Sequence, residues 1–371
     1  MKRISILFAM GGIMRRAGAE TVTMRYIREI VNNKKFKISV LVHGFGIGDY
    51  DEELNALGIS IYHVPVRGKN LLTYNAVLND FFYKHNFDIV HCNMDMACGD
   101  FLEVAKRNGV KIRIAHAHST NYQSKNPLRV FNSYLSKCKI PKVATNLIAC
   151  SRLAGKWMYN NNDFIIIKNA LNLDEYKPNL KIREAVRLEL QIKENDFVIG
   201  HVGRFEFEKN HDGLIRFFKE YNCIHKNSIL VCVGDGSRKR DVEKTIKLMQ
   251  LTKNVRFLGV RNDVQRIMQA FDVFVLPSLF EGLPLVGIEA QATGLPCIFS
   301  NKITSEVCIG DKCYRLPLEE KSEWVKCLEK INGEIVNYNF NKIQLRGNGY
   351  DIKEEAAKLM DFYCECVTNK R

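Results

Sequence analysis

Short apolar runs alternate with segments of helical periodicity along the whole chain. The run at 271–276, for example, is apolar and β-branched, which is typical of a strand buried on both faces of a parallel sheet. The alternation of strands with helices predicts an α/β protein. Strands are predicted at 4–10, 38–43, 59–64, 88–92, 111–117, 146–150, 164–167, 197–202, 228–233, 271–276 and 297–299, and helices at 20–31, 71–85, 126–139, 285–292 and 351–367.

The most informative segment is the strand–loop–helix unit over 271–299. Its loop carries Glu281 and ends at Pro284, which suits the first turn of a helix because no backbone N–H is needed there. Backbone N–H groups at 283–286 would carry partial positive charge and could seat phosphate oxygens. Glu281 and Glu289 cannot share one helical face, so we interpret them as binding different hydroxyls of one ligand. The alternative is a capped helix with a solvated glutamate.

Phosphate chemistry is also indicated after the predicted strand at 197–202. Gly203 lets the backbone approach a ligand closely, the Arg204 guanidinium can fork onto phosphate oxygens, and Lys209 adds a point charge. Another glycine turn, at Gly234, follows the strand at 228–233. Surface salt bridges are the alternative interpretation of the two cations.

The first half of the chain places two more groups at predicted strand ends. The loop after the first strand is rich in glycine and includes Gly12, which allows a ligand to come close. His116 and His118 lie on the same side of the strand at 111–117, at the carboxyl edge where open α/β sheets bind ligands. Two histidines could ligate a metal, but no third ligand is near in sequence. A structural role for both is the other alternative.

The segment from Glu281 to Leu285, followed by Glu289, resembles the E-x7-E signature of family 4, the retaining glycosyltransferases of the GT-B fold. Gly203-Arg204 with Lys209-Asn210 matches that family's G-R…K-[GN] pattern. Residues 168–174 resemble its N-G-[IV]-D segment, with Ala170 in place of the glycine. The motifs occur in the expected order over nearly the whole chain, and the enzymes it resembles most are bacterial capsular and exopolysaccharide glycosyltransferases.

The resemblance implies two Rossmann-like domains whose parallel sheets face each other across a cleft. Residues 1–172 would form the acceptor-side domain, joined by a C-terminal helix at 351–371. Residues 178–350 would form the nucleotide-sugar-binding domain, and 172–178 would be the linker.

The resemblance also implies roles for individual residues. Arg204 and Lys209 would hold the donor diphosphate, Glu281 would orient the donor sugar, Glu289 would bind the ribose, and His118 would touch the transferred sugar. No metal ion or cofactor is expected, because the protein's own cations take the role of a divalent ion. The expected catalytic residues are His118, Arg204, Lys209 and Glu281. The expected donor-binding residues are Gly12, Gly203, Arg204, Lys209, Gly234, Val260, Asp263, Glu281, Gly282, Leu283, Pro284, Leu285 and Glu289.

Composition and charge narrow the choice of partner. The 371 residues are 46% hydrophobic and 26% charged, typical of a globular protein, and no apolar run is long enough for a transmembrane helix. Twelve cysteines without metal-binding spacing indicate reduced thiols in the cytoplasm. The net charge is +14, and residues 1–170 hold 24 Lys and Arg against 12 Asp and Glu. No nucleic-acid-binding motif accompanies this charge, so nucleic acid is not the expected partner.

The predicted helix at 126–139 is amphipathic and flanked by lysines and arginines. Such a helix can lie on an anionic membrane surface, which would make the protein peripheral on the inner face of the cell membrane. It can equally pack on its own domain.

Together these features predict a hexosyl- or N-acetylhexosaminyltransferase that retains anomeric configuration. It would move a sugar from a nucleotide-diphosphate donor, a UDP-sugar by expectation, to a saccharide acceptor in surface polysaccharide biosynthesis. We expect that acceptor to be lipid-linked. Two alternatives stay open: a GT-B UDP-GlcNAc 2-epimerase, and a non-catalytic nucleotide-sugar-binding subunit.

Overall fold

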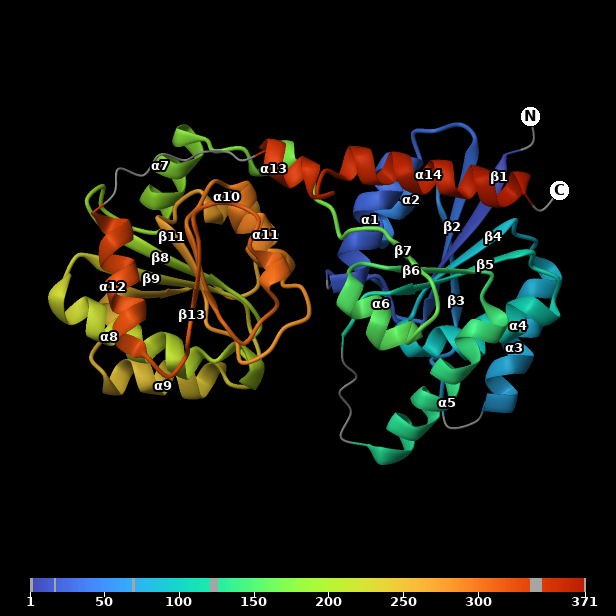
Figure 1. Cartoon of the computed structure of the whole chain (residues 1–371), viewed down its shortest axis with the longest axis horizontal. Coiled ribbons are helices and arrows are strands. Elements are labelled where there is room, and N and C mark those ends of the chain that lie inside the picture. The colour runs from blue at the N-terminus through green and yellow to red at the C-terminus, as the bar shows by residue number, and fades with distance from the viewer. Residues whose placement is uncertain (1–2, 17, 69–70, 121–125, 334–341, 370–371) are drawn as a thin grey trace. The chain divides into compact units, whose positions relative to one another are not determined.

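Two parallel β-sheets covered by helices make up the computed structural model of the chain (Figure 1). The structure describes residues 3–16, 18–68, 71–120, 126–333 and 342–369. The chain divides into two compact units, Met1–Leu171 with Gly349–Arg371, and Asn172–Asn348. Each unit is a doubly wound, Rossmann-like α/β domain, as the alternation of strands and helices predicts.

The first unit has a seven-stranded sheet in the order β3-β2-β1-β4-β5-β6-β7, and its paired strands run parallel. The strand order reverses between β1 and β4. In open α/β sheets, ligands bind at the carboxyl ends of the two strands that flank such a reversal. The strands are β1 (Ile4–Met10), β2 (Phe36–His43), β3 (Ser60–Val64), β4 (Ile89–Asn93), β5 (Ile112–Ala117), β6 (Asn146–Ala149) and β7 (Ile165–Ile166).

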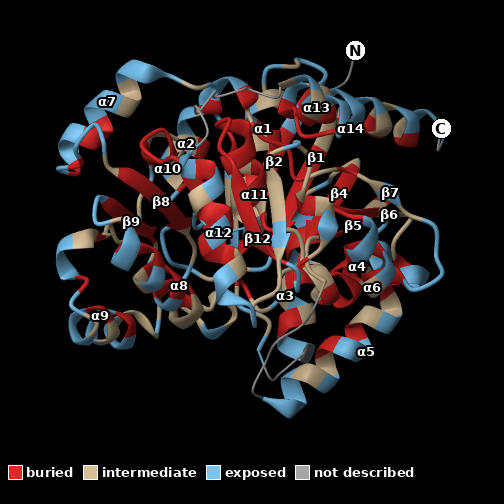
Figure 2. Cartoon of the chain, turned by 60° about the vertical axis from the view of Figure 1, so that its left-hand side comes forward, coloured by how far each residue is buried: buried red, intermediate tan, exposed pale blue. Residues whose placement is uncertain are grey.

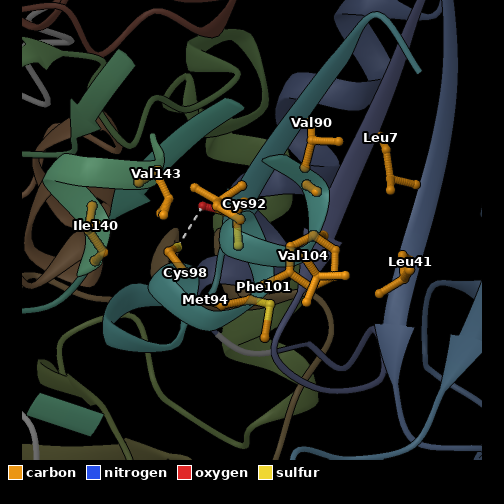
Figure 3. Packing of buried hydrophobic residues seen from close by; sticks show 14 of the residues in the cluster. Leu7, Leu41, Val90, Cys92, Met94, Cys98, Phe101, Val104, Ile140 and Val143 are labelled. Carbon is orange, nitrogen blue, oxygen red and sulfur yellow. Dashed lines mark hydrogen bonds between the residues drawn. The ribbon is translucent and has the colours of Figure 1, made fainter. Parts of the chain in front are cut away.

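Helices cover the first sheet and bury its apolar side chains (Figure 3). Leu7 of β1 and Val90 of β4 belong to the same buried cluster as Phe101 of α4 (Cys98–Arg107). The Cys98 thiol donates a hydrogen bond to the Cys92 carbonyl at 3.2 Å, which ties the start of α4 to β4. The other helices between β1 and β7 are α1 (Gly18–Ile30), α2 (Asp51–Ala56), α3 (Leu71–Lys84), α5 (Pro127–Val143) and α6 (Arg152–Tyr159).

The C-terminal helix, α14 (Ile352–Thr368), belongs to the first unit and packs beside α1 (Figure 1). The backbone of Leu171 accepts a hydrogen bond from Ile352 and donates one to Tyr350, both at 2.9 Å. The point where the chain leaves the first unit is therefore bonded to the point where it returns. The Asp351 carboxylate caps α14 by accepting the Lys353 N–H at 3.0 Å.

The second unit has a six-stranded sheet in the order β10-β9-β8-β11-β12-β13, again with parallel pairs. Here the order reverses between β8 and β11. The strands are β8 (Phe197–Val202), β9 (Ser228–Val233), β10 (Val255–Phe257), β11 (Val273–Leu276), β12 (Cys297–Ser300) and β13 (Cys313–Leu316). The helices are α7 (Leu180–Glu189), α8 (His211–Ile224), α9 (Lys239–Leu248), α10 (Val264–Met268), α11 (Leu285–Ala292), α12 (Lys321–Asn332) and α13 (Lys342–Gly347).

Residues 172–178, the expected linker, contain a short 3-10 helix, η2 (Leu173–Tyr176), and belong to the second unit. Leu173 and Tyr176 are three residues apart, so they lie on one face of this turn, and both are buried.

The strands β1 and β8 are almost entirely buried, whereas α5 carries exposed residues along its length (Figure 2). None of the helices within the described ranges combines the length and the apolar composition needed to cross a bilayer.

Candidate functional site

Strands β8 and β11 of the second unit are direct neighbours, with Ile199 paired to Val273 and Gly200 to Phe274. They flank the reversal of strand order, so the loops that follow them meet at the carboxyl edge of the sheet. These two loops carry the G-R…K motif and the first glutamate of the E-x7-E motif. The fold therefore brings the two strongest sequence motifs to one place.

Lys209 and Glu281 form an ion pair across this edge, with 2.5 Å between Nζ and Oε1. Their side chains are only 13% and 16% exposed. The Ser278 hydroxyl donates to the same Oε1 at 3.0 Å, and Ser278 is itself fully buried. The carboxylate and the ammonium group are therefore held in a fixed, half-enclosed position, as a site that binds a diphosphate and a sugar would require.

Asn210 locks the two loops together. Its backbone adopts the left-handed conformation, with φ of 53°, and its side-chain oxygen accepts the Gly213 N–H at 3.2 Å to cap α8. Its side-chain nitrogen donates to the Pro277 carbonyl at 3.0 Å. A backbone bond from Leu279 to Glu208, at 2.8 Å, joins the same loops. These bonds hold the loop that carries Lys209 against the loop that carries Glu281.

Two glycines allow a third loop to reach this site. Gly234 follows β9 with φ of +134°, and a Cβ there would lie 2.1 Å from the Gly203 carbonyl oxygen. A Cβ at Gly203 would in turn lie 3.2 Å from the side chain of Lys209. A side chain is excluded at Gly234, where it would meet backbone at a positive φ, and at Gly203 it would require the Lys209 side chain to shift.

The N-terminus of α11 completes this edge of the second unit. The helix begins at Leu285 with Pro284 as its N-cap residue, and none of the described side chains caps it. Its first N–H groups carry partial positive charge, which favours an anion. Gly287 lets the helix lie close to the sheet, because a Cβ there would be 2.9 Å from the Phe299 ring of β12. Gly282 and Leu283 lie in the preceding loop, and Glu289 is half-buried one turn into α11.

Three expected donor-binding residues are either exposed or bonded to neighbours other than Lys209 and Glu281. Arg204 is on the loop after β8, but its side chain is 76% exposed and lies 3.3 Å from Glu208. Val260 is exposed on the loop after β10. The Asp263 carboxylate accepts two hydrogen bonds from Arg261, at 2.8 and 2.9 Å, which hold the pKa of Asp263 below its usual range. The Asp263 carboxylate is thus already occupied by a neighbouring arginine.

Two buried histidines flank the loop between β8 and α8, and sequence reasoning did not identify them. His201 of β8 donates from Nδ1 to the Val275 carbonyl at 2.9 Å. His211, the first residue of α8, stacks on Phe205 with ring centroids 4.0 Å apart. Burial, reinforced by the charges of Lys209 and Arg238, lowers the pKa of His211 to about 4. Burial likewise holds the pKa of His201 well below its usual range, so both rings are neutral at pH 7 and add no charge next to this loop.

In the first unit, His118 follows β5 and is held by residues at and just beyond the carboxyl end of β4. Its Nε2 lies 2.8 Å from the Asn93 side-chain oxygen, and its backbone N–H donates to the Asp95 carboxylate at 2.8 Å. Asp95 has φ of 47°, an uncommon conformation for a residue with a side chain, and also binds the Ser119 hydroxyl at 2.8 Å. Strain of this kind persists where surrounding contacts enforce it, often at functional sites.

Asn93 and Asp95 were not among the predicted residues of the first unit. The signal that could have found them is the alternation of polar residues at 91, 93 and 95 over the carboxyl end of β4. Gly12 lies on the loop after β1, the other strand at the reversal, and a Cβ there would meet no described atom within 4 Å. Its surroundings leave room for a larger residue.

The family model for glycosyl transferases group 1 matches residues 182–320, within the second unit. Over 374 residues the chain is 32% identical to the putative glycosyltransferase EpsF of Bacillus subtilis, covering 96% of each protein. It is 28% identical to an Escherichia coli protein, UDP-Gal:alpha-D-GlcNAc-diphosphoundecaprenol alpha-1,3-galactosyltransferase, with 95% of each covered. Among solved structures, HepE of Anabaena in complex with UDP and glucose superposes with a TM-score of 0.79 at 18% identity, covering 97% of this chain and 99% of HepE.

The match to HepE concerns the fold, which is the GT-B arrangement of two Rossmann-like domains. The match to EpsF extends over nearly the whole of both chains at an identity that establishes common family. The chain accordingly belongs to the group 1 glycosyl transferases and is a glycosyltransferase, similar also to the capsular polysaccharide biosynthesis glycosyltransferase CapH of Staphylococcus aureus, to which it is 25% identical over 366 residues.

Proposed function

We propose that this glycosyltransferase moves a hexosyl or N-acetylhexosaminyl group from a UDP-sugar to a lipid-linked saccharide, with retention of anomeric configuration. The observation that carries the proposal is the Lys209–Glu281 pair beside the open N-terminus of α11. The pair sets a cation for a diphosphate next to a carboxylate for sugar hydroxyls. The printed name of the Escherichia coli relative, which specifies UDP-Gal and a diphosphoundecaprenol-linked acceptor, supports the choice of donor and acceptor.

The second unit is proposed to stabilise the leaving diphosphate. As the bond between the anomeric carbon and the phosphate oxygen breaks, negative charge grows on the phosphates. Lys209, Arg204 and the first N–H groups of α11 would bind that charge more strongly than they bind the ground state, which lowers the barrier. Protein cations thereby take the role that a divalent ion has elsewhere.

Glu281 and Lys209 are proposed to act as a unit. The carboxylate holds the Lys209 ammonium group in place before the donor arrives, which reduces the ordering required on binding. Ser278 binds only one carboxylate oxygen, Oε1, which is also the one that meets Lys209. We propose that the other oxygen, Oε2, accepts hydrogen bonds from hydroxyls of the donor sugar.

The first unit is proposed to bind the acceptor, and His118 to contact the transferred sugar. Burial lowers the pKa of His118, so its imidazole is neutral at pH 7 and can exchange hydrogen bonds with hydroxyl groups. Its contacts with Asn93 and Asp95 fix its position before substrate binds.

We further propose that α5 rests on an anionic membrane surface, where a lipid-linked acceptor would be found. Leu128, Phe131 and Leu135 form one stripe on α5 and are 58%, 60% and 50% exposed. Arg129 and Lys142 on the same helix are also exposed. Apolar side chains exposed beside cations are typical of helices that lie in a membrane interface.

An assay with radiolabelled UDP-galactose, UDP-glucose and UDP-N-acetylglucosamine tests the proposed transfer. Polyprenyl-diphosphate-linked N-acetylglucosamine serves as acceptor, and a reaction without acceptor is the control. Transfer of label to the lipid fraction supports the proposal. Binding of UDP without any transfer, or sugar epimerisation in the control reaction, contradicts it.

A further inference from the structure

A line of buried polar contacts joins the C-terminal helix to His118 in the first unit. The Tyr363 hydroxyl, on α14, lies 2.5 Å from Nδ1 of His91 on β4. Nε2 of His91 lies 3.0 Å from Nδ1 of His116 on β5. The rings of His116 and His118 then pack against each other, with centroids 4.1 Å apart. Tyr363 is fully buried, and His91 and His116 are 1% and 4% exposed.

The two inner histidines of this line are neutral. Burial lowers the pKa of His91 to about 3, and burial likewise holds the pKa of His116 well below its usual range. A neutral imidazole has one N–H donor and one bare nitrogen that accepts. Once the donor of one hydrogen bond along the line is known, the donor and the acceptor of the next hydrogen bond follow from it.

The Tyr363 hydroxyl fixes that direction. His91 Nδ1 is the acceptor that the described residues offer it, so Tyr363 donates to His91. His91 must then carry its proton on Nε2 and donate to Nδ1 of His116. His116 in turn carries its proton on Nε2, an atom that is buried without a hydrogen-bond partner among the described residues. The opposite direction would leave two buried groups unpaired, the phenol proton of Tyr363 and the bare Nε2 of His116, whereas the first direction leaves only the Nε2 proton of His116 unpaired, so the first costs less.

We propose that Tyr363 and His91 are positioning residues that fix the tautomer and ring orientation of His116, and through its ring the placement of His118. The inference rests on the proposed function only in the role of His118, the residue expected to contact the transferred sugar. Helix α14, which follows the second unit in the sequence, would thereby contribute to catalysis through His118. Neither Tyr363 nor His91 reaches substrate in this scheme.

The tautomers can be measured directly in the wild-type protein. Two-bond 15N–1H NMR spectra of the full chain, labelled with 15N-histidine, distinguish a protonated Nδ1 from a protonated Nε2. His91→Gln and His116→Gln variants assign the signals. We expect both histidines to carry the proton on Nε2 at pH 7. A proton on Nδ1 of either residue overturns the proposal, and this measurement needs neither a substrate nor a Tyr363 variant.

Kinetics test whether the line acts through His118. We expect Tyr363→Phe to lower kcat about tenfold, because small displacements of a substrate-contacting group have effects of this size, and to leave the Kd for UDP unchanged. Adding Tyr363→Phe to His118→Ala should cause no further loss. Tyr159→Phe is the matched control, since its buried hydroxyl also bonds to β5, at the Ala115 carbonyl, 2.8 Å away. We expect its kcat to stay within about twofold of wild type.

Different results would overturn the positioning role of Tyr363 and His91 and the proposed role of His118. Full additivity of Tyr363→Phe with His118→Ala, or an equal kcat loss in Tyr159→Phe, overturns the positioning role. Wild-type kcat in His118→Ala instead removes the proposed function of His118, and with it the positioning role in catalysis. The tautomers measured by NMR would be unaffected by that result.

Discussion

Lys209 and Glu281 are 72 residues apart in the sequence, yet the lysine Nζ lies 2.5 Å from Oε1 of the glutamate. The contact exists because β8 and β11 are neighbours at the reversal of strand order, and because Asn210 bonds the loop of one strand to the loop of the other. The pair places opposite charges side by side at the edge of the sheet where a nucleotide-sugar is proposed to bind.

Removing the lysine should abolish most of the activity. We expect Lys209→Ala to lower kcat/KM at least a hundredfold, roughly 3 kcal/mol of transition-state stabilisation, because the growing charge on the diphosphate loses its nearest cation. Lys244→Ala is the matched control, since Lys244 is 78% exposed on α9 and pairs only loosely with Asp241. Steady-state rates with UDP-sugar and acceptor provide the measurement. Wild-type activity in Lys209→Ala would remove this residue from the mechanism.

Replacing the glutamate should separate binding from turnover. We expect Glu281→Gln to change the Kd for UDP by less than about threefold, because the glutamine side-chain oxygen can still accept a hydrogen bond from Lys209 and hold it in place. Turnover should nevertheless fall about a hundredfold, since the group proposed to orient the sugar has lost its charge. Calorimetric titration with UDP and rate measurements check the two halves. Parallel losses of UDP affinity and rate would show that Glu281 supports the diphosphate rather than the sugar.

The glycine at 234 should be irreplaceable. We expect Gly234→Ala to destabilise the second unit by roughly 3 kcal/mol, because its φ of +134° and a Cβ 2.1 Å from the Gly203 oxygen both oppose a side chain. Gly109→Ala is the control, because its φ is +80° but a Cβ there would meet no described atom within 4 Å, so only backbone strain of about 1 kcal/mol applies. Chemical denaturation measures both. Equal losses in the two variants would refute the packing argument.

Protonation of His211 should weaken the fold at low pH. Its pKa is about 4 in the folded state against about 6.5 when unfolded, so the unfolded chain binds the proton more readily. The His211 contribution is fully present above pH 6.5 and is lost as the pH falls from 6.5 towards 4. We expect about 2 kcal/mol less stability at pH 5 than at pH 7.5 from this residue. Replacing it by His211→Gln should reduce the pH dependence by that amount. An unchanged dependence would contradict the assignment.

The exposed stripe on α5 should be needed for membrane contact. We expect Phe131→Ser to reduce flotation with vesicles of phosphatidylcholine and phosphatidylglycerol, because it removes a side chain that is 60% exposed. Leu248→Ser on the basic helix α9 is the control, since Leu248 is 85% exposed but belongs to the second unit. Wild-type protein should float poorly with phosphatidylcholine alone. Equal recovery with both vesicle types would argue against an anionic membrane partner.

Sequence predicts well those helices and strands in which the apolar pattern and the residues at the two ends all favour the same structure. Helix α11 begins and ends where predicted because Pro284 and Gly294 mark its ends, and β1 and β8 match because their apolar runs are unbroken. Helix α4 was not predicted, although its apolar residues lie at helical spacing. The edge strand β13 alternates only weakly and carries Arg315, so its sequence resembles a loop.

For the site residues, too, only local sequence signals could be predicted. Lys209 and Glu281 were predicted as site residues because each belongs to a local motif suited to phosphate or sugar chemistry. Their mutual contact could not be read from the sequence, since it depends on strand order. Tyr363 and His91 gave no signal either, because each occupies an ordinary core position in its own element and acquires a partner 272 residues away only after folding.

The structure of this protein with UDP bound, determined from crystals grown with and without a divalent cation, would show whether Lys209 and α11 bind the diphosphate. We expect the diphosphate to lie within hydrogen-bonding distance of Lys209 Nζ and of the first N–H groups of α11, in both crystals and without a metal ion. UDP bound away from Lys209, or a divalent ion bridging its phosphates, would contradict this expectation.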